Sequence, residues 1–229
     1  IAPAAGIAIN GLAGGGAMTD FNNDGFLDLM VSSWSLEDQV HLLINNGDGT
    51  FENQTEDAGI LGITGGLNMQ YADYDNDGDS DVLVLRGAWL FGAGHHPNSL
   101  LRNNGDGSFS DVTESAGLLS FRPTQTAAWA DFNNDGWLDV YIGNEQTERD
   151  PHPCELYLNN KDGTFTEHAS RAGITVNAWV KGISSGDFDN DGWPDLYVSV
   201  LDGPNKLFRN KGLDPNGELA FEDVSQIGR

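Results

Sequence analysis

The sequence predicts an all-β fold built from four copies of one antiparallel unit, and three observations support this prediction. An acidic nine-residue segment recurs four times along the 229 residues. Each copy runs directly into a short apolar segment rich in strand-forming residues, such as "VLVL" or "VYI". Each unit then carries a second apolar segment that ends in a turn such as Asn-Gly-Asp-Gly. Regular self-similarity of this kind indicates a repeat architecture.

The repeats keep a constant phase. The acidic segments are "DFNNDGFLD" at 20–28, "DYDNDGDSD" at 73–81, "DFNNDGWLD" at 131–139 and "DFDNDGWPD" at 187–195. Each begins 15 residues after an "AGI" or "AGL" triplet, which starts at Ala5, Ala58, Ala116 and Ala172. We therefore expect a single repeat domain over residues 1–229, with units at about 5–57, 58–115, 116–171 and 172–228.

Each unit is expected to hold four strands. The first leads into the acidic segment, at 15–20, 67–73, 126–131 and 181–187, and the second leaves it, at 27–33, 80–86, 138–144 and 194–200. The third strand is predicted at 42–46, 100–104, 156–160 and 207–211, and a tight turn joins it to the fourth. Four antiparallel strands per unit of about 50 residues are typical of a β-propeller blade. Four blades either close as a small ring or form an open arc, part of a larger propeller.

The spacing of the acidic segment, D-x-[DN]-x-D-G-x-x-D, predicts a calcium loop between the first two strands of each blade. It supplies side-chain oxygens at positions one, three, five and nine, and a backbone carbonyl at position seven, which suits the six to eight oxygen ligands that Ca²⁺ takes. The expected ligands are Asp20, Asn22, Asp24, Phe26 and Asp28; Asp73, Asp75, Asp77, Asp79 and Asp81; Asp131, Asn133, Asp135, Trp137 and Asp139; and Asp187, Asp189, Asp191, Trp193 and Asp195. Phe26, Asp79, Trp137 and Trp193 are expected to contribute only their carbonyls.

About four Ca²⁺ ions, one per loop, are therefore expected. Magnesium is disfavoured because it prefers a stiff octahedron and keeps its waters. An EF-hand is excluded, because that loop needs a glutamate at position twelve and flanking helices, and position twelve here is Val31, Val84, Ile142 or Val198. The Asn-Gly-Asp-Gly hairpins are interpreted as plain turns, with an auxiliary cation site as the alternative.

Composition narrows the classes of partner. The chain has 35 acidic and 11 basic residues and a formal net charge of -24, which disfavours nucleic acid and anionic membrane surfaces. No apolar run reaches the roughly 20 residues that a membrane helix needs. With 38% hydrophobic and 10% aromatic residues, the chain is expected to be globular rather than disordered. The expected partners are metal cations and basic molecules, and a protein or glycan ligand of unknown identity.

The wording "DFNNDGxLDL…LYxNNGDGTF" resembles the FG-GAP or VCBS repeat β-propeller family, which includes the calcium-binding blades of integrin α-chains and the cartilage acidic protein group. The resemblance extends from Ala5 to about Ser225. Literal Phe-Gly and Gly-Ala-Pro signatures are mostly missing, which favours the VCBS-like branch. The resemblance implies calcium between the first two strands of each blade, an extracellular, cell-surface or periplasmic location, and about seven blades in a complete propeller.

The segments between the second and third strands, at 34–41, 87–99, 144–155 and 201–206, vary between units and are candidates for ligand recognition. Trp34, Trp89 and Phe91 lie in them, either to stack on a ligand or to cap a blade, whereas Trp129 and Trp179 are expected in the core. His95, His96, His152 and Cys154 form a conceivable transition-metal site, with solvated loop histidines as the simpler interpretation. Asn53 begins a possible glycosylation sequon.

Three functional hypotheses follow. The leading one is a calcium-stabilised extracellular binding or adhesion module whose variable loops recognise a protein or glycan. The second is a structural subunit that assembles into homo-oligomers or filaments through open β edges, with residues 1–19 either an added strand or an ordinary linking segment. The third is a polysaccharide-acting propeller enzyme or its accessory domain. Because the sequence has no nucleophile elbow, phosphate loop or zinc spacing, we expect no enzymatic activity.

Overall fold

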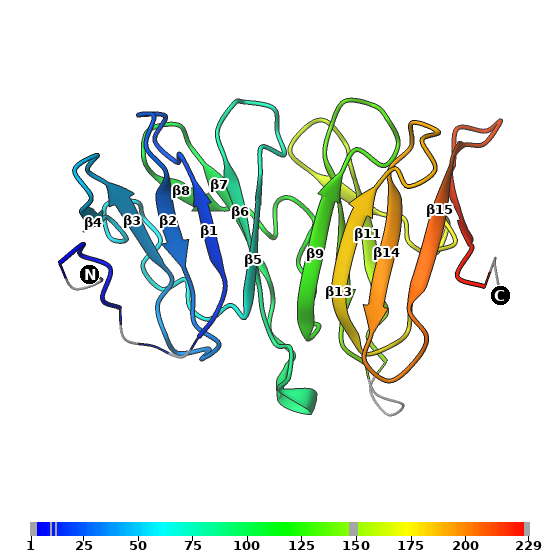
Figure 1. The fold of residues 1–229 in the computed structure, drawn as a ribbon, viewed down its shortest axis with the longest axis horizontal. Coiled ribbons are helices and arrows are strands. Elements are labelled where there is room, and N and C mark those ends of the chain that lie inside the picture. The colour runs from blue at the N-terminus through cyan, green and yellow to red at the C-terminus, as the bar shows by residue number, and fades with distance from the viewer. Residues whose placement is uncertain (1–3, 10, 12, 147–150, 227–229) are drawn as a thin grey trace.

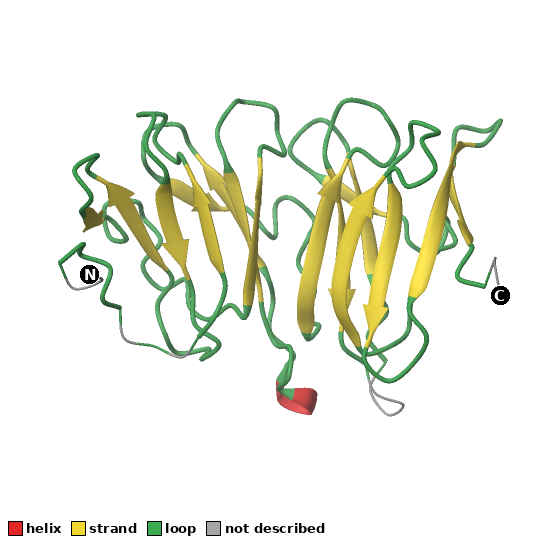
Figure 2. Cartoon of the chain, in the orientation of Figure 1, coloured by secondary structure: helices red, strands yellow, loops and turns green. Residues whose placement is uncertain are grey.

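The computed structural model describes residues 4–9, 11, 13–146 and 151–226, and these form four antiparallel sheets of four strands each (Figures 1 and 2). The first sheet contains β1 (Gly16–Thr19), β2 (Asp28–Val31), β3 (His41–Asn45) and β4 (Phe51–Asn53); the second contains β5 (Asn68–Ala72), β6 (Asp81–Leu85), β7 (Ser99–Asn103) and β8 (Phe109–Asp111). The third contains β9 (Thr124–Ala130), β10 (Asp139–Asn144), β11 (Glu155–Asn159) and β12 (Phe165–Glu167); the fourth contains β13 (Val180–Gly186), β14 (Asp195–Val200), β15 (Lys206–Leu213) and β16 (Leu219–Asp223). A short 3-10 turn, η1 (Phe91–Ala93), lies between β6 and β7.

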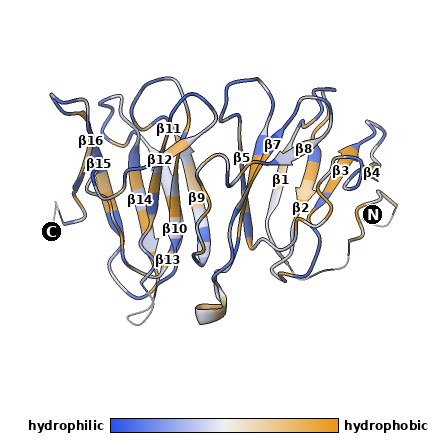
Figure 3. Ribbon diagram, turned by 180° about the vertical axis from the view of Figure 1, so that it is seen from behind, coloured by the Kyte–Doolittle hydropathy of each residue, from blue (hydrophilic) through white to orange (hydrophobic). Residues whose placement is uncertain are grey.

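The predicted all-β architecture of four-stranded antiparallel blades is confirmed. In every sheet the strands are hydrogen-bonded in chain order, so each blade is a simple meander. The blades stand side by side in chain order, with the first strands β1, β5, β9 and β13 next to one another. The first and fourth blades lie at opposite ends of this row (Figures 1 and 3), and no ring closure is seen among the described residues.

The hydrophobic core is divided into three clusters, one at each junction between neighbouring blades. The sequence of strand β6 is a continuous apolar run because both faces of the strand are covered. Val82 and Val84 pack toward the first blade, and Leu83 and Leu85 pack toward the third. A strand with both faces covered needs no polar alternation. The apolar stretches follow the strands in the hydropathy view (Figure 3).

Each junction also contains one repeated polar contact, made by an asparagine on the third strand of the second, third and fourth blades. There, an asparagine side chain donates a hydrogen bond to the backbone carbonyl at position two of the preceding blade's acidic loop. The three bonds run from Asn103 Nδ2 to Phe21 O, from Asn159 Nδ2 to Tyr74 O and from Asn210 Nδ2 to Phe132 O, each 2.8 Å long. We call this contact the asparagine bridge; it joins the blades at their loop edge.

The described part of the N-terminal stretch behaves as a linking segment. The carbonyl of Ala5 accepts a hydrogen bond from the backbone N–H of Phe51 at 2.8 Å, as the carbonyl of Ala58 does from Phe109 in the next blade. Strand β1 begins only at Gly16. Residues 1–3, 10 and 12 of this stretch, and residues 147–150 of the third variable segment, lie outside the described residues.

Removal of one asparagine bridge should destabilise the fold measurably. In Asn159→Ala, the carbonyls of Tyr74 and Leu138 each lose a buried donor, at 2.8 and 3.1 Å. We expect the free energy of unfolding to fall by about 1–3 kcal/mol in urea denaturation. The control is Asn160→Ala at the exposed neighbouring position, which should change it by less than about 0.5 kcal/mol. Equal effects of the two substitutions would contradict the assigned role of the bridge.

Candidate metal centres

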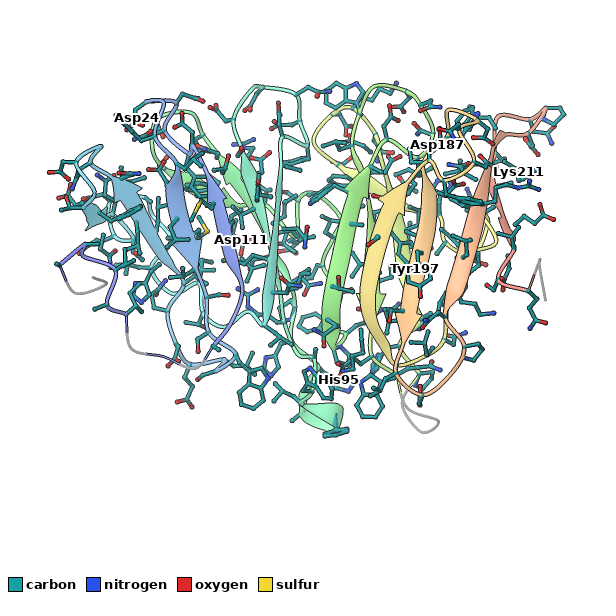
Figure 4. All side chains as sticks on the ribbon, viewed as in Figure 1. Asp24, His95, Asp111, Asp187, Tyr197 and Lys211 are labelled. Atoms are coloured by element: carbon teal, nitrogen blue, oxygen red, sulfur yellow. The ribbon has the colours of Figure 1, made fainter. Side chains whose placement is uncertain are left out.

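The four acidic loops connect the first and second strands of their blades and lie at one common edge of the molecule. Figure 4 shows Asp24 of the first loop and Asp187 of the fourth at this edge, and His95 at the opposite edge. Each loop turns sharply through two left-handed residues, an asparagine at position four with φ of 52 to 60° and a glycine at position six with φ of 88 to 95°. Asparagine and glycine adopt this conformation most easily, so the Asn-Asp-Gly sequence sets the shape of the loop.

The aspartate at position one is held by the backbone of its own loop. In the second loop, Asp73 accepts hydrogen bonds from the backbone N–H groups of Asp77 and Gly78, both at 3.1 Å. Asp20, Asp131 and Asp187 accept the corresponding pair of bonds in their loops. The same carboxylate orientation is therefore built into all four loops.

The aspartate at position nine is the first residue of the second strand and is buried in every blade. In the second blade, Asp81 Oδ2 accepts from the N–H of Tyr74 at 3.2 Å, and Asp81 Oδ1 accepts from the N–H of Asn103 at 2.8 Å. Asp28, Asp139 and Asp195 make the same two contacts. This carboxylate thus fastens the acidic loop to the third strand.

Positions one, three and nine converge in two of the loops. One carboxylate oxygen from each of Asp73, Asp75 and Asp81 lies within 4.8 Å of the others, and Asp187, Asp189 and Asp195 form a second such triad. In the first and third loops, position three is Asn22 or Asn133, whose amide oxygen accepts the N–H of position five at 3.1 Å. Those loops offer one carboxylate fewer, although an amide oxygen is also a calcium ligand.

The structure gives less direct support to the predicted ligands at positions five and seven than to those at positions one, three and nine. Asp24, Asp77, Asp135 and Asp191, at position five, accept the backbone N–H of position seven at 2.8 to 3.0 Å and belong to neither triad. Position seven is Phe26, Asp79, Trp137 and Trp193, and the use of these carbonyls as ligands stays a prediction. The side chain of Asp79 instead accepts a hydrogen bond from Asn23 Nδ2 of the first loop at 2.6 Å.

One buried oxygen atom of the second loop indicates whether a cation fits the triad of Asp73, Asp75 and Asp81. Asp75 Oδ1 is buried and has no hydrogen-bond partner among the described residues. A buried carboxylate oxygen without a donor is costly, and a metal ion compensates it as a hydrogen bond would. All three side chains of this triad carry hard oxygen donors, the type that Ca²⁺ prefers. The second loop therefore fits a divalent cation.

Burial is the main influence on the pKa of the aspartates at position nine. Desolvation raises the pKa of Asp81 to about 8 and that of Asp139 to about 7, against the opposing effect of the two backbone hydrogen bonds each accepts. Burial likewise raises the pKa of Asp28, Asp195 and Asp75. Nearby carboxylates add to the rise in pKa, and a cation bound among them would favour the ionised form of each aspartate.

Two kinds of asparagine in this region were missed by the sequence reasoning. The asparagine at position four links neighbouring loops: Asn76 Nδ2 donates to Gly136 O at 3.1 Å, and Asn134 Nδ2 donates to Gly192 O at 2.9 Å. The other kind forms the asparagine bridge. The sequence did contain a signal, because both positions are asparagine in all four units. These asparagines were overlooked because the sequence was searched only for metal ligands.

The histidines and Cys154 do not form a comparable centre. The rings of His95 and His152 contact each other with centroids 4.8 Å apart, whereas His96 lines a cavity together with Arg86. Burial raises the pKa of the Cys154 thiol to about 12, so it stays protonated and is a poor metal ligand. In the part of the chain that the structure describes, the aspartate triads are the only groups of three such side chains close enough to share an ion.

Comparison with known proteins agrees with this geometry. The chain matches the FG-GAP-like repeat over residues 20–84, 90–142 and 147–198. It belongs to the FG-GAP-like repeat family. This confirms the resemblance recognised in the sequence, and FG-GAP-like repeats often bind calcium and are generally extracellular.

The chain is also a distant homologue of cartilage acidic protein 1. It is 25% identical to the Xenopus tropicalis protein over 177 residues, which is 75% of this chain and 26% of that protein. It is 27% identical to the Homo sapiens protein over 158 residues, 67% of this chain and 22% of that protein. The chain thus spans about a quarter of the length of these relatives. Among the described residues, no helix has the length and apolar character needed to cross a membrane.

The raised pKa values predict that the stability of the fold depends on pH differently with and without calcium. In the metal-free protein the folded state holds the protons of Asp81 and Asp139 more tightly than the unfolded state does, so its stability falls as pH rises from about 4 to about 8. Bound calcium requires the ionised carboxylates, so in saturating calcium this fall should disappear. Urea unfolding across this pH range, in chelator and in calcium, measures both.

The control for this prediction is a pair of variants. Asp81→Asn removes the titrating group and should flatten part of the metal-free pH dependence. Asp106→Asn, in an exposed hairpin turn of the same blade, should leave the dependence as it is. A metal-free protein whose stability rises with pH over this range would contradict the argument.

Proposed function

We propose that the chain is a calcium-stabilised extracellular binding or adhesion module whose variable loops recognise a protein or a glycan. The observation that carries the calcium part is the buried, unpartnered Asp75 Oδ1 inside an aspartate triad. The described residues offer this oxygen no hydrogen-bond donor, and the acidic loop with the spacing D-x-[DN]-x-D-G-x-x-D recurs in each blade. Membership of the FG-GAP-like repeat family supports both calcium binding and an extracellular location.

A bound cation would act on the fold through the position-nine aspartate. Asp81 is fixed to the third strand by the N–H of Asn103, whereas Asp73 is fixed within the loop. An ion held by both would tie the loop to the strand and neutralise the repulsion among the carboxylates. Ca²⁺ tolerates the mixture of carboxylate, amide and carbonyl oxygens in these loops, and Mg²⁺, which requires a stricter octahedron, suits them less.

A candidate ligand surface lies at the opposite edge of the blades, formed by Trp89, Phe91, Trp179 and Lys181. We call it the aromatic shelf. The ring centroids of Trp89 and Phe91 lie 6.0 and 5.4 Å from that of Trp179, and Lys181 Nζ lies 3.0 Å from the centroid of the Trp89 ring. Trp89 is 44% exposed and Phe91 58% exposed. Exposed aromatic rings beside a cation suit stacking on a sugar ring or an aromatic peptide side chain.

The aromatic shelf is held in place rather than loosely displayed. The buried Glu145 pairs with Lys181, and Glu145 Oε2 also accepts the backbone N–H of Trp89 at 2.7 Å. Trp89 and Phe91 both have left-handed backbones, with φ of 66 and 49°, which is unfavourable for aromatic residues. Such strained residues are frequent in ligand-binding sites. Trp179, expected in the core from the sequence, is half-buried beneath these rings.

Calcium stoichiometry tests the ligand assignment. Equilibrium dialysis should find one ion bound per acidic loop, with dissociation constants of about 10⁻⁴ to 10⁻³ M, as in other extracellular calcium modules. Asp75→Ala should bind one ion fewer and melt at a lower temperature in calcium. Asp106→Ala, an aspartate in the exposed hairpin turn of the same blade, should bind as many ions as the unaltered chain. An unchanged stoichiometry in Asp75→Ala would show that the assignment is wrong.

Ligand recognition by the aromatic shelf is tested on an array of glycans and extracellular matrix proteins. Any partner captured by the unaltered chain should bind at least about tenfold more weakly to Trp89→Ala, because truncating an aromatic residue at a binding hot spot costs about 2 kcal/mol or more. Phe26→Ala, which removes a 48% exposed ring at the opposite edge, is the control. Equal loss in both variants would place the ligand elsewhere.

The alternative hypothesis of a polysaccharide-acting enzyme predicts a different result when the chain is incubated with an acidic polysaccharide. A binding module retains an acidic polysaccharide without shortening it. Size analysis of the polysaccharide after incubation separates the two, and calcium-dependent cleavage would favour the enzyme hypothesis over the one proposed here.

A further inference from the structure

The guanidinium of Arg86 is a buried cation that forms no ion pair with any described residue. Arg86 follows β6, is 7% exposed and lines a cavity of about 300 Å³ at the internal junction between the first and second blades. Its Nε donates to Thr64 O at 2.6 Å, and its Nη1 donates to Pro97 O at 3.0 Å and to Ser99 Oγ at 2.8 Å. All three acceptors are uncharged, and Nη2 has no acceptor among the described residues.

The charge of Arg86 is balanced only from a distance. Burial lowers the pKa of Arg86 to about 10, against the opposing effect of the nearby Asp111 carboxylate, so the guanidinium is charged at neutral pH. Asp111 lines the same cavity, but its Oδ1 accepts the N–H and the hydroxyl of Thr113, at 3.1 and 2.5 Å. A buried charge without a paired opposite charge is unfavourable, so the cavity favours an anion beside Nη2.

The contact with the proline carbonyl does not require a charged side chain. In the third blade Asn144 occupies the position of Arg86, since each lies five residues after the position-nine aspartate. Asn144 Nδ2 donates to Pro153 O at 2.9 Å, as Arg86 donates to Pro97 O. The equivalent residues of the first and fourth blades are the uncharged Ser33 and Val200. An arginine at this position is therefore specific to the second blade.

The third blade also shows what a cation at this place pairs with. There, Arg122 Nη1 donates to Pro153 O at 2.9 Å, and Arg122 Nε lies 3.2 Å from Oε1 of the buried Glu155. Glu155 is the first residue of β11, and the equivalent first residue of β7 is Ser99. The second blade thus has the cation and the proline carbonyl of this arrangement but lacks its carboxylate.

We propose that the cavity beside Arg86 binds a sugar acid with one carboxylate, which takes the place that Glu155 occupies in the third blade. The carboxylate accepts hydrogen bonds from Arg86 Nη2 and from the hydroxyl of Ser99. A guanidinium suits this role because its N–H groups match the geometry of a carboxylate. The hydroxyl groups of the sugar donate to the exposed carboxylate of Asp111 on the cavity wall.

The lining and the net charge of the chain favour this class of ligand over other anions. Asp111 repels a doubly charged ion such as inorganic phosphate, whereas it accepts hydrogen bonds from hydroxyl groups. The formal net charge of -24 likewise disfavours a densely anionic polymer. A cavity of about 300 Å³ lies at the lower end of the range for small-molecule sites, which suits a single sugar ring.

The site belongs to the variable segments but is separate from the aromatic shelf. His96 and Pro97 of the second variable segment and Leu36 of the first line the cavity, and Trp89 does not. The inference rests on the proposed function in one respect, which is that the variable segments recognise a glycan. It adds the chemical class of the sugar and a second place where the chain holds it.

The test titrates D-glucuronate, a sugar acid with one carboxylate, into the full chain in saturating calcium and follows binding by calorimetry. Arg86→Asn keeps an amide at this position, as in the third blade, and should weaken binding at least about tenfold, because a charged hydrogen-bond donor is lost. Arg171→Asn removes the same charge from an exposed site of the third blade and should leave binding unchanged. D-glucose, which has no carboxylate, should bind at least about tenfold more weakly than D-glucuronate.

A second variant supplies the missing carboxylate from the chain itself. In Ser99→Glu the new side chain should pair with Arg86 as Glu155 pairs with Arg122. We therefore expect a higher melting temperature and loss of D-glucuronate binding. Circular dichroism and calcium stoichiometry show whether each variant is folded. If Arg86→Asn unfolds, Ser99→Glu and the comparison with D-glucose decide the question.

Three results would overturn the proposal: no binding of D-glucuronate by the unaltered chain, equal binding of D-glucose, or undiminished binding by folded Arg86→Asn. Loss of binding in Trp89→Ala but not in Arg86→Asn would assign the sugar acid to the aromatic shelf. That result would overturn this inference and support the proposed function. Calcium stoichiometry does not depend on Arg86, so the calcium part of the proposed function is judged separately.

Discussion

The structure depends on one buried carboxylate per blade, the aspartate at position nine of the acidic loop. Its two oxygens join the start of the loop to the third strand, and the asparagine that donates one of those N–H groups also carries the bridge to the preceding blade. The shape of the loop, its attachment to the third strand and the packing of the blades therefore all depend on Asp81 and its equivalents. Burying a charge at each of these points is unfavourable unless it is compensated.

This arrangement explains why the acidic segments are clustered rather than spread over the surface. Five aspartates in nine residues of the second loop repel one another, and burial of Asp81 adds a desolvation cost. A divalent cation bound in the loop would offset both effects at the point where the loop meets the strand. The family relation and the orphaned oxygen of Asp75 support this interpretation independently of each other. Because the repeat places the loops side by side, local metal binding also bears on the junctions.

Much of the fold could be predicted from the sequence, because the strands follow directly from phase, apolar runs and turn residues. The loop positions that converge were predicted as well, since positions one, three and nine are aspartate or asparagine in every unit. The asparagine bridge was not, because its acceptor is a backbone carbonyl 78 to 85 residues away, which no side-chain pattern reveals. The aromatic shelf was predicted only in part. Trp89 and Phe91 were candidates for ligand stacking, but Trp179 looked like a core residue, and its contact with a loop of another blade could not be read from the sequence.

The two edges of the blades carry different constraints, and this separates stability from recognition. At the acidic edge, almost every position is committed to hydrogen bonds within or between blades, so its sequence is nearly constant among the four units. At the opposite edge, the connecting segments differ in length and composition, and the contacts they make across the junctions differ as well, such as the bridge between Gly87 and Thr124 and the hydrogen bond from the Trp89 N–H to Glu145. A ligand surface built from Trp89, Phe91 and Trp179 can therefore vary without disturbing the metal loops. Calcium would then affect recognition at this edge only indirectly, through the packing of the blades that position the three rings.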